Sequence, residues 1–146
     1  MEPISKSPDT PDAYIDLTAI VENWRRLAAL APGSETSAVV KANAYGLGMS
    51  QIATALAESG CRTFFTAYAS EAIALRQALG EGPEIIVFNG PSDSNINMFA
   101  QGACTPVLNS EAQIALWRRS GLTTPAFLHV DTGMNRLGLR DTAFDA

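Results

Sequence analysis

The sequence is poor in positive charge, in cysteine and in histidine. Its 146 residues carry 10 Lys and Arg against 15 Asp and Glu, which gives a net charge of −5. Clustered cations are the basis of nucleic-acid affinity, so this balance argues against a nucleic-acid partner. The only cysteines, Cys61 and Cys104, are far apart and have no ligand neighbour at zinc-site spacing. They therefore predict neither a disulfide framework nor a metal site, and are expected to be small core residues.

Long hydrophobic runs are also absent. No apolar stretch approaches the ~20 residues that a membrane span requires, so no membrane partner is expected. Residues 1–11 are polar, contain three prolines and lack the apolar segment of a signal peptide. We therefore predict an extended tail over residues 1–11 and a cytoplasmic, reducing location. With 47% hydrophobic residues, the rest of the chain can form the core of one domain.

Short apolar runs alternate with amphipathic helical stretches along the chain. The runs are mostly apolar on both sides and are bounded by Gly, Pro, Asn or Ser, as in a parallel sheet that is covered on both faces. This order predicts an α/β fold. From about residue 39 the runs recur roughly every 20–25 residues, a spacing typical of βα units. The expected strands are residues 14–17, 37–41, 63–68, 84–88, 104–108 and 126–130.

Side-chain periodicity predicts the helices between these strands. A helix that begins near residue 18 is expected to bury one stripe, and a capping box is expected at Ser110 and Gln113. Trp24 and Trp117 both lie on such stripes and are predicted to be core residues. The stripe of the first helix comprises Ile20, Trp24, Leu27 and Ala28.

Two architectures fit this alternation. One is an open, doubly wound sheet of about five strands, which is complete at this length. The other is a (β/α)8 TIM-type barrel, which needs about 250 residues, so that the chain would end after barrel strand five. Composition and spacing do not distinguish the two.

The segment VVKANAYGLG, residues 39–48, carries the strongest chemical signal. It places Lys41 at the carboxyl end of a strand, where α/β proteins bind ligands. The small residues that follow allow close approach of a flat ligand, and a helix N-terminus with the Tyr45 phenol suits a phosphate. Together they suggest a phosphorylated aldehyde held on Lys41 as a Schiff base, which is pyridoxal phosphate chemistry. The simpler alternative is a surface lysine at the rim of the sheet.

At this segment the sequence resembles the alanine racemases, whose signature runs V-x-K-A-N/D-A-Y-G-H-G. Only Leu47 departs from it, where the commonest form has histidine. Further segments resemble the second strand and helix, the fourth strand, and the fifth strand with its loop, in the family's order and spacing over roughly residues 12–144. These segments are FTAYASEA at 65–72, TPVLNS at 105–110 and HVDTGMNRLG at 129–138.

The resemblance implies a fold and an activity. Residues 12–146 would form part of a pyridoxal-phosphate-binding (β/α)8 barrel, with the rest of the barrel and a C-terminal β domain outside this sequence. The family is a homodimeric isomerase that interconverts L-alanine and D-alanine for peptidoglycan precursors by a two-base mechanism. Its second base is a tyrosine from the C-terminal domain of the partner subunit, so these 146 residues alone are expected to be inactive.

Roles for individual residues follow from the same resemblance. Lys41 would hold pyridoxal 5'-phosphate and act as the base on the D-alanine side, and Tyr45 would donate to the cofactor phosphate. Arg136 would bind the substrate carboxylate. His129 stands where many members carry a carbamylated lysine, so it is interpreted either as a core histidine with one hydrogen bond or as the neighbour of a substitute anion near Arg136. Asp131 is interpreted as a turn-forming residue beside the glycine that follows it.

Two other functions compete with this one. A non-catalytic module on the same barrel could bind pyridoxal phosphate without turnover, and a doubly wound domain could lack a cofactor altogether. Arg136 favours the racemase, because a cofactor carrier has no need of an arginine for a substrate carboxylate.

Overall fold

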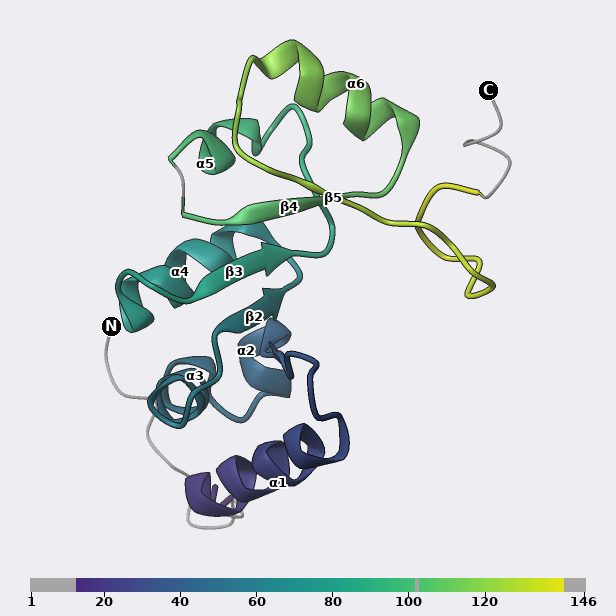
Figure 1. The fold of residues 1–146 in the computed structure, drawn as a ribbon. Helices are drawn as coiled ribbons and strands as arrows, with labels where there is room; N and C mark the ends of the chain where they lie inside the picture. Colours follow the sequence, from purple (N-terminus) through teal and green to yellow (C-terminus); the bar gives the residue numbers. More distant parts are fainter. Residues whose placement is uncertain (1–12, 102, 141–146) are drawn as a thin grey trace.

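The computed structural model describes residues 13–101 and 103–140, and its centre is a parallel sheet (Figure 1). The five strands pair in chain order, β1-β2-β3-β4-β5, with every pairing parallel. The tail predicted over residues 1–11 lies outside the described residues. The strands are β1 (Ala38–Val39), β2 (Thr63–Thr66), β3 (Glu84–Val87), β4 (Thr105–Leu108) and β5 (Phe127–Leu128).

Helices alternate with the strands, as the sequence predicts for an α/β fold. A doubly wound sheet reverses its strand order at a switch point. The order here runs from β1 to β5 without a reversal, as in the wall of a (β/α)8 barrel. Of the two architectures that fit the sequence spacing, the structure therefore favours part of a barrel over a doubly wound sheet. The helices are α1 (Leu17–Leu30), α2 (Lys41–Tyr45), α3 (Met49–Glu58), α4 (Ala69–Leu79), α5 (Ile96–Ala100) and α6 (Glu111–Ser120).

The strand predicted over residues 14–17 is wrong. These residues lead into α1, and Leu17 is already its first helical residue. The Asp16 carboxylate accepts a hydrogen bond of 3.1 Å from the Ala19 backbone N–H. An N-cap of this kind satisfies a donor that the first helical turn leaves free, which favours a helix start over a strand.

The core lies between the helices and one face of the sheet. Cys61 and Cys104 are both buried in it, as predicted. Trp117 is buried and meets Phe99 edge to face at 5.9 Å, whereas Trp24 is half-buried and donates from Nε1 to the Thr36 carbonyl at 3.0 Å. The large aromatic rings therefore fill the space between the outer helices and the sheet.

The predicted stripe of α1 is only partly buried. Ile20 and Trp24 pack against the core and Ala28 is half-buried, but Leu27 is 61% exposed. The helix packs against α3, and its buried residue is Val21, so the packed face is turned toward Val21 and away from Leu27. The prediction for Leu27 is therefore wrong, because the helical period is compatible with neighbouring stripes on one helix and tertiary packing decides which of them is buried.

The start of α6 carries one half of the predicted capping box. Ser110 Oγ accepts a hydrogen bond from the Gln113 backbone N–H at 3.3 Å. Gln113 Oε1 does not reach back to Ser110; it accepts instead from the Asn109 backbone N–H at 2.7 Å. The glutamine is thus used to fix the residue that follows β4.

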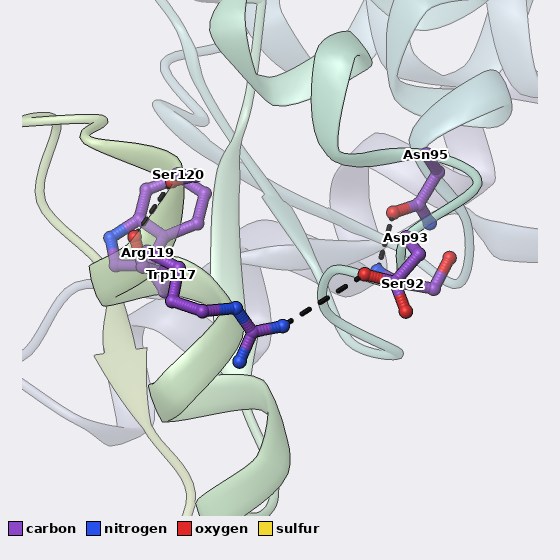
Figure 2. Close-up of polar contacts among 6 residues, drawn as sticks. All are labelled: Ser92, Asp93, Asn95, Trp117, Arg119 and Ser120. Atoms are coloured by element: carbon purple, nitrogen blue, oxygen red, sulfur yellow. Dashed lines mark hydrogen bonds and ion pairs between the residues drawn. The ribbon is translucent and has the colours of Figure 1, made fainter.

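The outer surface of α6 is tied only loosely to the turn before α5. Arg119 Nη2 lies 4.0 Å from Asp93 Oδ1, and both side chains are largely exposed. Figure 2 shows the two side chains facing each other. The same view shows Ser120 Oγ donating to the Trp117 carbonyl at 2.7 Å near the end of α6. Exposed ion pairs of this kind contribute little stability, so the buried aromatic contacts hold α6 in place.

The second face of the sheet is apolar and partly open. Register aligns Val39 with Phe65 and Phe65 with Ile86, and it aligns Val107 with Phe127. Toward the two ends of the described sheet, Val39 is 40% exposed and Phe127 is 46% exposed. Both faces are apolar, as predicted, but only one is covered by helices within the described residues.

Within the residues that the structure describes, no helix is both long enough and apolar enough to cross a membrane.

Candidate functional site

A cavity of about 690 Å³ opens at the carboxyl ends of the strands. This volume falls within the range of small-molecule sites. All three site residues predicted from the sequence, Lys41, Tyr45 and Arg136, line this one cavity, although Arg136 is far from the other two in the chain. The residues that follow the ends of β2 to β5 complete its wall: Ala67, Tyr68, Phe88, Asn89, Asn109 and His129.

Lys41 opens a turn that runs in the left-handed sense. Ala42, Asn43 and Ala44 have φ of 51°, 54° and 53° with ψ of 47°, 46° and 49°, and Tyr45 has φ of 57°. Residues other than glycine pay roughly 1–2 kcal/mol each for this conformation. Four such residues in succession require contacts from elsewhere in the fold to hold them.

The turn brings the Lys41 amine and the Tyr45 phenol to the same cavity. Lys41 Nζ lies 6.0 Å from the centroid of the Tyr45 ring and 5.8 Å from that of Phe88. Phe88 in turn stacks on Phe65 with centroids 4.7 Å apart, which fixes its plane. An amine and a phenol thus stand beside a rigid aromatic wall.

Asn43 closes the turn onto the next helix. Its Oδ1 accepts a hydrogen bond of 2.9 Å from the Met49 backbone N–H, the first of α3. Its carbonyl accepts from Gly48 N–H at 2.9 Å. Gly46, at the end of the turn, has φ of 87°, which a glycine adopts at little cost. The signature residues are therefore used largely for backbone geometry.

His129 has a defined tautomer. Its Nδ1 lies 2.7 Å from Asn109 Oδ1, while Asn109 Nδ2 donates to the carbonyls of Phe88 at 2.8 Å and Val107 at 3.1 Å. These two donations fix the amide with its oxygen toward the histidine, so Nδ1 carries the proton. This confirms the predicted single hydrogen bond of His129, but the side chain is half-buried at the cavity wall and does not belong to the core. In the neutral ring, Nε2 is then an acceptor at the cavity wall.

Asn109 was not singled out by the sequence, although it is buried at the end of β4. It also accepts from Gly138 N–H at 3.2 Å, which brings the end of the loop after β5 back to the sheet. Gly138 has φ of 109°, and a Cβ there would lie 2.9 Å from Asp131 N and 3.1 Å from His129 Cδ2. Only glycine fits at position 138, where the returning loop passes close to Asp131 and His129, without a shift of backbone.

Asp131 organises the loop that carries Arg136. Its carboxylate accepts hydrogen bonds from Gly133 N–H at 3.0 Å and from Asn135 N–H at 3.0 and 3.1 Å. The prediction of a turn-forming residue is confirmed. These backbone N–H groups hold the pKa of the Asp131 carboxyl below its ordinary value, because they stabilise the ionised form.

The Asp131 loop should therefore loosen in acid. A carboxyl with a lowered folded-state pKa stabilises the loop fully above its unfolded value of ~3.9, and this contribution is lost as pH falls through the folded pKa. We expect the Gly133 and Asn135 amide NMR shifts to titrate with a midpoint below ~3.9. The Asp131→Asn variant should show no such step. A midpoint at or above the unfolded value in the unsubstituted protein would contradict this assignment.

Other chemistries find little support in the described part of the chain. No group of three His, Cys, Asp or Glu side chains suited to a metal ion occurs over residues 13–101 and 103–140. Burial raises the pKa of the Cys104 thiol to about 11 and also raises the pKa of Cys61. Both thiols therefore stay protonated near neutral pH, which disfavours a nucleophilic role.

Comparison with known proteins agrees with the resemblance at every level. The family described as "Alanine racemase, N-terminal domain" matches residues 15–146. A catabolic alanine racemase of Mesorhizobium japonicum is 46% identical over 149 residues, covering 99% of this chain and 39% of that protein. An alanine racemase of Methylobacterium nodulans is 50% identical over 129 residues, covering 86% of this chain and 35% of that protein.

A solved structure shows the same fold. The alanine racemase of Bartonella henselae, crystallised with covalently bound pyridoxal phosphate, is 45% identical, with a TM-score of 0.81 over 88% of this chain and 37% of that chain. The present chain spans less than two fifths of the length of each of these three relatives.

Proposed function

The chain belongs to the alanine racemase family, whose N-terminal domain it matches, and on that premise we propose that it supplies the pyridoxal phosphate site of an enzyme that interconverts L-alanine and D-alanine. One observation carries the proposal: Lys41, Tyr45 and Arg136 line a single cavity at the carboxyl ends of the strands. Amine, phenol and guanidinium are the groups that an aldehyde, a phosphate and a carboxylate require.

The cavity suits this cofactor. Its wall combines small residues, Ala42 and Ala67, with the Phe88 ring, so a flat heteroaromatic ring has room beside the Lys41 amine. Tyr45 stands on the same turn as Lys41 and would donate from its hydroxyl to the phosphate. The covalently bound pyridoxal phosphate of the Bartonella henselae relative supports the same cofactor here.

Each residue has a definite part in the reaction. When bound, pyridoxal phosphate supplies an electron sink that makes the α-hydrogen of an amino acid acidic enough for an ordinary base. Lys41 Nζ binds the cofactor and then takes or returns the proton on the D-alanine side of Cα. Arg136 binds the substrate carboxylate through its planar guanidinium and so orients Cα toward Lys41. His129, with Nδ1 held by Asn109, offers Nε2 as an acceptor at the cavity wall.

Racemisation also requires a base on the opposite face of Cα. We propose that a tyrosine outside this sequence supplies it, from a C-terminal β domain of the partner subunit in a homodimer. Exposed apolar side chains near the mouth of the cavity, Met134 at 72% and Leu137 at 42%, support a covering segment or subunit there. The remaining barrel strands would complete the sheet beyond β5.

The symmetry of the reaction leaves its physiological direction to the surrounding metabolism. L-alanine and D-alanine have equal free energies, so a racemase accelerates both directions equally and the site itself does not set the direction. We propose supply of D-alanine for peptidoglycan precursors as the main use. The catabolic relative of Mesorhizobium japonicum makes consumption of D-alanine the alternative that a growth test would distinguish.

The experiment that tests this function is reduction of the loaded, complete protein with borohydride, followed by peptide mapping. The sequence contains only two lysines, Lys41 and Lys6, so the map has a built-in control. We expect the pyridoxyl group on Lys41, with labelling of this chain lost in Lys41→Ala and kept in Lys6→Ala. A pyridoxyl group found elsewhere while Lys41 stays free would overturn the proposal.

Arg136 provides a quantitative prediction. The Arg136→Lys variant keeps the positive charge but loses the planar fork that binds a carboxylate with two parallel hydrogen bonds. We expect kcat/KM for alanine to fall by about 10- to 150-fold, equivalent to about 1.5–3 kcal/mol. The matched control is Arg140→Lys, an exposed arginine four residues on that does not line this cavity. An unchanged kcat/KM in Arg136→Lys would remove the carboxylate role.

A further inference from the structure

We propose that Glu71 is a positioning residue that holds the left-handed turn after Lys41, and thereby sets where Lys41 and Tyr45 stand. This inference rests on the proposed function, because it concerns the turn that carries the cofactor lysine. Glu71 lies in the first turn of α4 and is half-buried. It does not line the cavity, so it acts through backbone and not by touching a ligand.

The Glu71 carboxylate joins two loops that follow neighbouring strands. Its Oε1 accepts a hydrogen bond of 2.7 Å from the Ala42 N–H, the residue directly after Lys41. Its Oε2 accepts from Ala67 N–H at 2.8 Å and from Tyr68 N–H at 3.2 Å, both directly after β2. One side chain thus satisfies three backbone donors, two of them local and one 29 residues away.

The chemistry of these contacts demands a carboxylate. All three partners are donors, and an ionised carboxylate presents only acceptor oxygens. The glutamine amide has one acceptor oxygen and one donating nitrogen, so in Glu71→Gln one side of the bridge would face N–H against N–H. Hydrogen bonds to a charged acceptor are also the stronger kind, and the N-terminus of α4 favours a negative charge.

The turn needs such an external anchor. Four successive residues at φ between 51° and 57° contradict the right-handed preference of non-glycine residues. The Glu71 bond to the Ala42 N–H fixes the peptide plane between Lys41 and Ala42, from which the left-handed residues start. Lys41 directly precedes the four left-handed residues and Tyr45 is the last of them, so the conformation of this turn sets where the two side chains meet in the cavity.

The test compares Glu71→Gln with Glu111→Gln in the complete protein. Glu111 is an exposed residue in the first turn of α6, so it controls for loss of charge at a helix N-terminus. In the cofactor-free protein we expect the Ala42 amide hydrogen to exchange about tenfold faster or more in Glu71→Gln, and the Kd for pyridoxal phosphate to rise about tenfold or more. Glu111→Gln should change neither quantity by more than about twofold.

A second variant addresses the handedness itself and keeps the test informative if Glu71→Gln folds poorly. Glycine adopts positive φ as readily as negative φ, so Ala42→Gly lowers the cost of the left-handed turn. We expect Glu71→Gln/Ala42→Gly to bind pyridoxal phosphate at least about threefold more tightly than Glu71→Gln alone. Absence of this recovery would overturn the positioning role.

The proposed function and the positioning role of Glu71 are tested by different results. If the unsubstituted protein bound no pyridoxal phosphate on Lys41, the proposed function would fail, and the exchange of the Ala42 amide would still decide whether Glu71 holds the turn. If the unsubstituted protein bound the cofactor and Glu71→Gln matched it in both exchange and Kd, the Glu71 inference alone would be overturned.

Discussion

Replacing Lys41 with alanine in the complete protein is expected to abolish racemisation of alanine. The substitution removes the amine that binds the cofactor covalently and the base on one face of Cα. A positioned acid–base group alone contributes typically about 10²–10⁴ to a rate, so we expect kcat to fall by about 10⁴ or more. Lys41→Ala should also bind pyridoxal phosphate only reversibly, without the near-visible absorbance of a lysine Schiff base.

The measurement is turnover from each enantiomer, with exchange of the α-hydrogen in deuterated water followed alongside. Lys6→Ala is the matched control, because it removes the only other lysine of the sequence. It should keep both activity and absorbance. A Lys41→Ala enzyme that turned over D-alanine within about tenfold of the unsubstituted rate would exclude Lys41 as the base on the D-alanine side.

A polypeptide limited to residues 1–146 is expected neither to racemise alanine nor to keep a tightly packed sheet. Its described sheet ends at β1 on one side and β5 on the other, and apolar side chains such as Val39 and Phe127 stay partly open to water. At ~25 cal/mol per Å², several hundred Å² of uncovered apolar surface costs on the order of 10 kcal/mol, comparable with the whole stability of a domain. Unpaired strand edges add a tendency to aggregate.

Hydrogen exchange and a coupled assay for D-alanine would check this expectation on the purified polypeptide. We expect weak protection at the ends of the sheet and no turnover. Supplying the remainder of the complete protein as a second polypeptide should restore both, and this serves as the positive control. Full turnover from a well-protected, monomeric 1–146 polypeptide would refute both the incomplete barrel and the second base from outside this sequence.

The sequence was most informative where structure depends on neighbours in the chain. Alternating apolar runs and helical stretches predicted the α/β order, and all five described strands lie inside predicted runs. Each is shorter than its run, and β1 ends before its predicted run does because Lys41 already belongs to the turn. The Asp131 loop was predictable for the same reason, since its hydrogen bonds reach only two to four residues ahead.

The two wrong predictions have different causes, one in the local sequence and one in the tertiary packing. The run over residues 14–17 satisfies the apolar pattern of a strand, but the Asp16 carboxylate caps the following helix and decides the matter. Leu27 fits the helical period and yet stays exposed, because the packing of α1 on α3 buries Val21 on a neighbouring stripe instead.

For the candidate site, too, the sequence and the tertiary structure supplied different information. The signature around Lys41 and the loop before Arg136 indicated by sequence alone which side chains bear the chemistry, and the resemblance to a family gave their roles. Only the tertiary structure showed that these residues share one cavity, that the turn after Lys41 is left-handed, and that Glu71 and Asn109 hold it and His129 in place. Their contacts span 29 and 20 residues, and the backbone conformation beside the Glu71 contact is one that local preference opposes. Sequence patterns report local preference, whereas contacts between distant strands are decided by the packing of the whole sheet.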